Sequence, residues 1–157
     1  MQQASDVEEV EKLLGRKPQG AFEIVVRKGD GGARVIRNAP FLDDGTPMPT
    51  LFWLVDPTDR RLVSRLESTG AIKEVEEMFG LQVLAQVHEE YSKERDHFIP
   101  TNYHGPKPTG GVGGTRRGIK CLHAHFAWFL AGGEDPVGEW VAERIYSGSK
   151  SCLQNLE

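Results

Sequence analysis

The chain has 157 residues, 38% of them hydrophobic and 27% charged, which is ordinary for a globular domain with its own core. The formal net charge of −4 argues against nucleic acid as a partner. No apolar run approaches the roughly 20 residues of a membrane-spanning helix, and the acidic N-terminus does not resemble a secretory signal. We therefore expect a cytoplasmic protein with no membrane association.

The N-terminal third of the sequence predicts one helix and a small antiparallel sheet. Hydrophobic residues recur at helical spacing between Ser5 and Gly15. Two segments rich in β-branched residues, 21–27 and 33–37, flank a glycine-rich turn and predict a hairpin. The nearly all-apolar run TLFWLV, residues 50–55, predicts a buried central strand.

The remainder of the sequence predicts a series of helices. Asp56-Pro57 is typical of a helix start, and glycines predict that this helix and the next end at Gly70 and Gly80. Helical spacing continues to about His97, and two further helices are expected at 119–130 and after Asp135. The fold class is α+β: about three antiparallel strands covered by four to six helices. We expect one domain, 1–146, and a loosely ordered tail, 147–157.

A long loop, residues 100–118, separates these helices and carries several glycines. Loops of this length are usually functional or disordered. Because unpaired N–H groups at a helix start favour an anion, the loop and the helix after it predict a phosphate or carboxylate site. The alternative is a flexible surface loop with solvated arginines. The residues expected to hold the anion are Gly113, Gly114, Arg116, Arg117 and Lys120.

Cys121, His123 and His125 follow at the start of that helix and allow two kinds of chemistry. If the helix begins at Ile119, Cys121 and His125 share one face and His123 points away. Cys121 and His125 would then bind zinc only with further ligands, for example His88. Alternatively, Cys121 acts as a thiolate nucleophile with His123, His125 or His88 as its base. The structural alternative is that Cys121 and His123 are packing residues.

Two other segments are weaker candidates. His88, Tyr91 and Arg95 form one stripe on a helix, which is either one wall of a pocket or the edge where the helix meets solvent. Thr46 lies in a proline-containing loop that leads into the apolar strand, where it either contacts a ligand or belongs to a braced turn.

Several motifs in combination resemble bacterial domain-of-unknown-function family 501. They are Gly15-Arg-x-Pro-x-Gly20, Ala39-Pro-x-Leu-x-Asp-Gly-Thr-Pro-x-Pro-Thr-Leu51, Arg65-Leu-Glu-x-x-Gly70, His88-Glu-x-Tyr91 with Arg95-Asp96, and Gly118-Ile-Lys-Cys-Leu-His123. The resemblance covers roughly residues 13–139. It implies a small bacterial cytoplasmic protein without assigning an activity. It also implies genes next to those for enolase, a septum-formation initiator and an exopolyphosphatase-like phosphatase, which favours phosphate chemistry or a cell-division partner.

We therefore expect a ligand-binding protein or an enzyme for a phosphorylated or otherwise anionic small molecule, with the ligand beside Cys121. Two alternatives stay open at this point. One is a non-enzymatic module that binds another protein, linked to cell division. The other is a zinc-binding protein, in which zinc is the cofactor.

Overall fold

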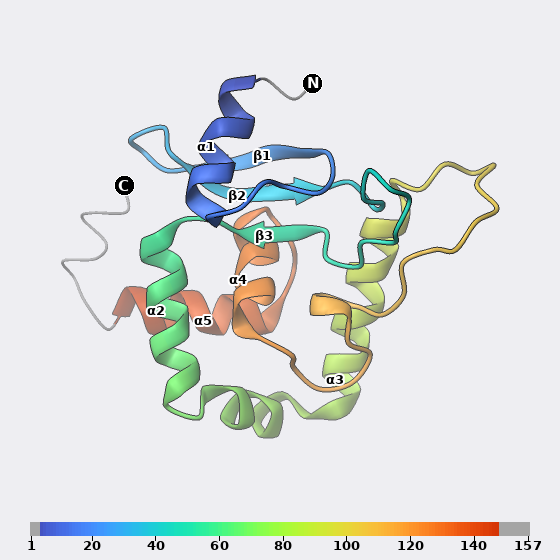
Figure 1. The fold of residues 1–157 in the computed structure, drawn as a ribbon. Helices are drawn as coiled ribbons and strands as arrows, with labels where there is room; N and C mark the ends of the chain where they lie inside the picture. The colour runs from blue at the N-terminus through green and yellow to red at the C-terminus, as the bar shows by residue number, and fades with distance from the viewer. Residues whose placement is uncertain (1–3, 148–157) are drawn as a thin grey trace.

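The computed structural model describes residues 4–147, and within them five α-helices accompany one three-stranded antiparallel sheet (Figure 1). This arrangement confirms the predicted α+β class. The expected tail, 147–157, lies outside the described residues except for its first position. The strands are β1 (Phe22–Arg27), β2 (Ala33–Asn38) and β3 (Phe52–Leu54). The helices are α1 (Ala4–Leu14), α2 (Pro57–Ser68), α3 (Ala71–Asp96), α4 (Leu122–Leu130) and α5 (Pro136–Ser147), with a short 3₁₀ turn, η1, at Val112–Gly114.

The strand order is β1-β2-β3, so β3 is an edge strand. The hairpin of β1 and β2 is confirmed, but the prediction that the TLFWLV run is the central strand is wrong. The run is apolar for a different reason, because elements cover both of its faces. Phe52 and Leu54 belong to the larger hydrophobic core, whereas Trp53 packs against a smaller core on the opposite face.

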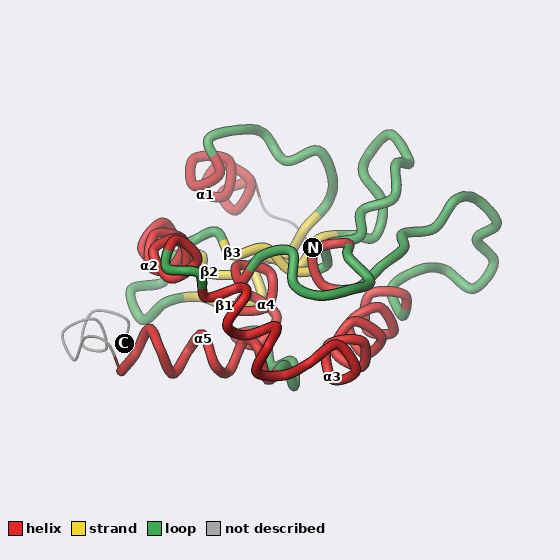
Figure 2. Tube along the Cα trace, turned by 90° about the horizontal axis from the view of Figure 1, so that it is seen from below, coloured by secondary structure: helices red, strands yellow, loops and turns green. Residues whose placement is uncertain are grey.

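Helices lie on both sides of the sheet (Figure 2). On one side, α1 contributes Val10 to the smaller core, where it packs with Phe22 and Ile36. On the other side, α4 packs directly on β3, and α5 packs on α4. Leu122 and Phe126 of α4 are fully buried in this larger core. The sheet therefore holds α1 and α4 on opposite faces of the same edge strand.

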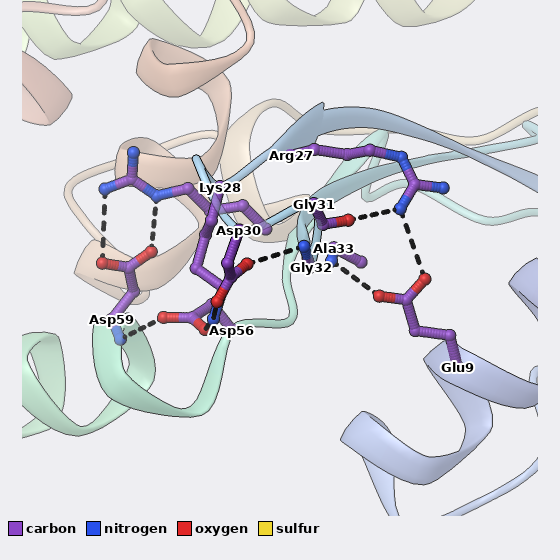
Figure 3. Close-up of polar contacts among 10 residues, drawn as sticks. Glu9, Arg27, Lys28, Asp30, Gly31, Gly32, Ala33, Asp56 and Asp59 are labelled. Carbon is purple, nitrogen blue, oxygen red and sulfur yellow. Dashed lines mark hydrogen bonds and ion pairs between the residues drawn. The ribbon is translucent and has the colours of Figure 1, made fainter. Parts of the chain in front are cut away.

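A cluster of charged side chains joins α2 to the hairpin (Figure 3). Asp56 caps α2 by accepting a hydrogen bond from the Asp59 N–H over 2.9 Å, and Lys28 Nζ lies 2.9 Å from the Asp56 carboxylate. Asp59 is fully buried and pairs with Arg34 at 2.7 and 3.3 Å. Burial raises the pKa of Asp59, while the Arg34 guanidinium acts in the opposite direction. These contacts position α2 beside β3.

Glu9 and Arg27 attach α1 to the hairpin (Figure 3). The Arg27 guanidinium lies 3.0 Å from Asp6 and 3.4 Å from Glu9, and Glu9 also accepts a hydrogen bond from the Ala33 N–H over 2.8 Å. The position of α1 matters for the site because the chain leaves this helix at Gly15, where φ is 73°, and then passes beside β3.

The long helix α3 is interrupted at Gly80, where φ is 78° and ψ is 160°. This interruption matches the predicted end of one helix and start of the next, because glycine is the residue that adopts such angles without strain. Across residues 4–147, none of the helices has both the length and the apolar character that crossing a bilayer requires.

Candidate functional site

The start of α4 differs from the expectation. The helix begins at Leu122 rather than Ile119, and Cys121 is its N-cap residue in an extended conformation, with φ −153° and ψ 153°. The Ile119 N–H donates a hydrogen bond to Glu76 Oε2 over 2.9 Å. Gly118, with φ 63°, and the extended Cys121 both have non-helical backbone angles. Because Cys121 precedes the helix, it does not share a helical face with His125, and the predicted pairing of these two residues is wrong.

Instead, three polar side chains come together where α2 passes the start of α4. One ligand atom from each of Glu67, Cys121 and His123 lies within 4.8 Å of the other two. Glu67 Oε2 accepts a hydrogen bond from the Leu122 N–H over 2.7 Å and lies 3.3 Å from His123 Nδ1. The Glu67 carboxylate thus occupies the helix start at which the sequence predicts an exogenous anion.

The second ring nitrogen of His123 also has partners. Nε2 lies 3.1 Å from Ser64 Oγ and 3.2 Å from the Arg60 carbonyl oxygen. A carbonyl oxygen only accepts hydrogen bonds, so the contact with Arg60 favours a hydrogen on Nε2, and the Glu67 carboxylate favours a hydrogen or another cation at Nδ1. Hydrogen bonding with Cys121 raises the pKa of His123, burial opposes this rise, and the charge of Glu67 adds to it.

Two members of this cluster, Cys121 and His123, line an open cleft of about 850 Å³, whereas the Glu67 side chain does not line it. The lining residues come from the end of α1, from β3, from α2 and from the start of α4, together with η1. Phe52 and Trp53 supply aromatic surface, and the Arg16 guanidinium lies 5.3 Å above the Trp53 ring. Among the described residues, no acidic side chain lines the cleft, whereas four basic ones do: Arg16, Arg60, Arg61 and Lys120.

His88 lies elsewhere and contacts the long loop. Its Nδ1 accepts a hydrogen bond from the Val112 N–H over 3.1 Å, and its Nε2 donates to the Gly118 carbonyl over 2.6 Å. Burial lowers the pKa of His88. A Cβ atom at Gly111 would collide with the His88 side chain. Both ring nitrogens of His88 are therefore bound to the loop backbone. Close packing against His88 accounts for the glycine at position 111.

The rest of the predicted helical stripe is also buried. The Tyr91 hydroxyl accepts hydrogen bonds from the Leu51 and Phe52 N–H groups over 2.6 and 3.1 Å. Arg95, only 1% exposed, donates to three loop carbonyl oxygens, those of Pro49, Pro108 and Gly110. Burial raises the pKa of Tyr91. Neither side chain lines the 850 Å³ cleft.

His125 forms a buried pair with Asp135. His125 Nδ1 lies 2.6 Å from Asp135 Oδ2, both side chains are 0% exposed, and the His125 ring centre is 6.0 Å from that of His88. Within residues 4–147, the group of metal-ligand types in mutual reach contains neither His88 nor His125. The structure therefore does not bring together the predicted zinc ligand set of Cys121, His125 and His88, because the two histidines lie in the buried interior.

The remaining predicted ligand residues divide between the cleft and other surfaces. Gly113 and Lys120 line the cleft beside Cys121. Arg116 lines a separate hollow of about 310 Å³ next to α3, and Arg117 is exposed. Gly114 is also exposed, with φ 81°. Thr46 is exposed in its own turn, where its N–H donates to Asp44 Oδ1 over 2.9 Å.

Sequence reasoning missed the contribution of α2. Arg60, Ser64 and Glu67 are spaced by four and three residues, so they share one face of the helix that Asp56 starts. That polar stripe was readable from the sequence. The proximity of this stripe to Cys121 could not be read from the sequence, because Ser64 and its contact His123 are 59 positions apart.

The fold and the cleft define an α+β protein with a basic cleft beside a thiol, an imidazole and a carboxylate. A family model described as Protein of unknown function (DUF501) matches residues 24–143, and the chain belongs to this family. The match confirms the resemblance and includes all the cleft cations except Arg16. Comparisons with curated proteins and with solved structures find no match.

Proposed function

We propose that this protein binds an anionic small molecule, of the phosphate or carboxylate class, in the cleft between α1, β3, α2 and the start of α4. The observation that carries the proposal is the charge of the cleft. Four basic side chains and no acidic one line it, although the whole chain has a net charge of −4. A concave surface with charges of one sign concentrates counter-ions and steers charged ligands.

The size and chemistry of the cleft suit such a ligand. Its volume of about 850 Å³ lies within the range of roughly 300 to 1,000 Å³ that small-molecule sites occupy. Three of its cations are arginines, whose planar guanidinium groups bind phosphate and carboxylate through paired hydrogen bonds. Trp53, which is partly exposed, offers apolar surface to the uncharged part of the ligand.

The proposal keeps the predicted ligand class and changes the residues. Lys120 stays, whereas Arg60 and Arg61 of α2 take the role expected of Arg116 and Arg117. Cys121, a free half-buried thiol, lies next to the bound anion, and a cytoplasmic location would keep it reduced. His123 places a second reactive group on the same side of the cleft.

A thermal-shift screen tests this proposal. The panel contains inorganic phosphate, pyrophosphate, a nucleoside triphosphate and citrate. We expect at least one of them to raise the melting temperature of the wild type and not that of the variant Arg61→Ala/Lys120→Ala. The matched control Arg116→Ala/Arg117→Ala removes the same charge outside the cleft and should keep the shift. Equal shifts in both double variants would refute the assignment of the cleft.

One observation favours the second candidate, a module that binds another protein. Met78, Leu81 and Val83 are 52%, 54% and 38% exposed on α3, on either side of the interruption at Gly80. Exposed apolar groups of this kind mark interaction surfaces when they adjoin one another. Affinity capture with wild type and Leu81→Glu tests this candidate, which fails if both proteins recover the same partners.

A further inference from the structure

We propose that Glu67, Cys121 and His123 bind a Zn²⁺ ion at the edge of the cleft, with the fourth coordination position open to the cleft. The site stands on its own contacts. Only the statement that the anionic ligand fills the open position rests on the proposed function.

The three side chains supply the three ligand types that zinc takes in proteins: carboxylate, thiolate and imidazole. Their ligand atoms already lie within 4.8 Å of one another. In a tetrahedral site with bonds of about 2.0 to 2.3 Å, neighbouring ligand atoms are roughly 3.3 to 3.8 Å apart. Glu67 Oε2 and His123 Nδ1 are at 3.3 Å. Closing the remaining gap needs a shift of about 1 Å, within the reach of side-chain rotation.

The hydrogen bonds of His123 point to a cation. In the neutral tautomer whose Nε2–H donates to the Arg60 carbonyl oxygen, 3.2 Å away, Nδ1 presents a lone pair. That lone pair lies 3.3 Å from the Glu67 carboxylate. Two acceptors at this distance repel each other unless a proton or a metal ion lies between them. Metal-bound histidines characteristically donate their second N–H to a backbone carbonyl or carboxylate, as His123 does.

The carboxylate is oriented in the same way. The Leu122 N–H donates to Glu67 Oε2 over 2.7 Å, which fixes the side chain of Glu67 against the start of α4. Glu67 therefore accepts a hydrogen bond from the backbone of α4 and His123 makes one to a backbone carbonyl of α2, which is the arrangement that outer groups provide around metal sites.

Binding of Zn²⁺ transfers no electrons. The Cys121 S–H bond breaks, its proton goes to solvent, and a bond forms between Sγ and the metal. Thiolate and carboxylate charges together neutralise the ion. Zinc sites with three protein ligands keep their fourth position for water or substrate. Because Cys121 and His123 line the cleft, that position faces the four cations, where an oxygen of the anionic ligand replaces the water.

Cobalt substitution tests the site directly. The full chain, purified without a histidine tag and stripped with a chelator, is titrated with Co²⁺ and then with Zn²⁺. We expect a thiolate-to-cobalt charge-transfer band that saturates at about one equivalent and disappears when Zn²⁺ displaces Co²⁺. Glu67→Gln and His123→Gln should each weaken Zn²⁺ binding by more than the roughly 10- to 100-fold cost of losing an orienting group.

Two cysteine variants identify the ligand. Cys121→Ser should abolish the band and still fold, because serine is a preferred residue at a helix N-cap. Cys152→Ser, the matched control, removes the only other cysteine and should keep the band. Absence of the band in the wild type overturns the proposal, as does its loss in Cys152→Ser. If Cys121→Ser does not fold, the cobalt titrations of the wild type and of Cys152→Ser still show whether Cys121 is the thiolate ligand.

The two proposals fail in distinguishable ways. If the anions stabilise the stripped protein and no cobalt band forms, the metal site is refuted and the anion site stands. If the band forms and no anion in the panel shifts the melting temperature with or without Zn²⁺, the metal site stands and the anion site is refuted.

Discussion

The structure contains two groups of histidines with opposite surroundings. His88 and His125 are buried, and the first has both ring nitrogens bound to the backbone of the long loop. His123 is half-buried at the cleft, where its partners are a thiol and a carboxylate. The pKa shifts follow this difference: burial lowers the pKa of His88, whereas its polar neighbours raise that of His123. His88 is thus held in place by the backbone of its own chain, whereas His123 is accessible from the cleft beside a thiol and a carboxylate.

Arginines divide in the same way. Arg95 is 1% exposed and directs its guanidinium to loop carbonyl groups, whereas Arg61 is exposed and lines the cleft. From this contrast we expect that substitutions of the buried histidines and of Arg95 lower the stability of the fold. Substitutions of cleft residues should leave stability nearly unchanged and abolish ligand binding.

The largest loss of stability is expected for Arg95→Met. The substitution keeps much of the volume but leaves the carbonyl oxygens of Pro49, Pro108 and Gly110 without their donor. We expect a cost of about 3 kcal/mol or more in the free energy of unfolding, measured by urea denaturation. Arg117→Met, at an exposed position, is the control and should change stability by no more than about 0.5 kcal/mol. Similar losses in both would break the comparison.

The next effect concerns Tyr91→Phe. Removing the hydroxyl leaves the Leu51 and Phe52 N–H groups without the acceptor that they share. We expect a loss of about 1 to 3 kcal/mol by urea denaturation, with anion and metal binding unchanged. If Tyr91→Phe instead lost ligand binding and kept the stability of the wild type, Tyr91 would be a ligand-binding residue, as the sequence predicts.

The pH dependence of stability should reveal His88. Burial has the largest effect on the pKa of His88 and lowers it, and the nearby His125 lowers it further. The hydrogen bond to the Gly118 carbonyl and the charge of Asp135 raise this pKa, but they do not outweigh burial. Because the unfolded chain binds this proton more tightly, the stabilisation is present above the unfolded pKa of about 6.5 and is lost as pH falls through the folded pKa. We expect His88→Gln to flatten the fall in unfolding free energy between pH 7 and 5.

A matched control for that measurement is His97→Gln, at an exposed position at the end of α3. Its slope against pH should equal that of the wild type when both are measured with chelator present. If His88→Gln and the wild type lose stability in parallel, His88 is not the neutral buried group that its hydrogen bonds indicate.

The smallest change in stability is expected for Cys121→Ser. The residue is half-buried at the N-cap of α4, where its side chain makes no capping hydrogen bond and serine is a favoured substitute. We expect the free energy of unfolding to stay within about 0.5 kcal/mol of the wild type by urea denaturation. A loss of several kcal/mol would show that Cys121 is a core residue and would remove the distinction between the two groups.

Much of the fold was predictable because its signals are local. The glycine-rich turn between segments of β-branched residues predicted the hairpin, Asp56-Pro57 predicted the start of α2, and Gly80 predicted the interruption in α3. Each signal depends on backbone angles or on hydrogen bonds between residues a few positions apart, which a sequence displays directly. The family was predictable for the same reason, since its motifs are short and contiguous.

The site itself depended on contacts between distant segments. The sequence determined that Cys121 and His123 lie near a helix start, but only the structure shows that the extended Cys121 is the N-cap residue and that the helix begins after it. Packing of α4 on β3 and α2 then brought Glu67 to the thiol and lined the cleft with cations from α2, from the segment after α1 and from the segment before α4. Such contacts form only when burial of the common core brings the helices together, and no spacing within a single segment records them.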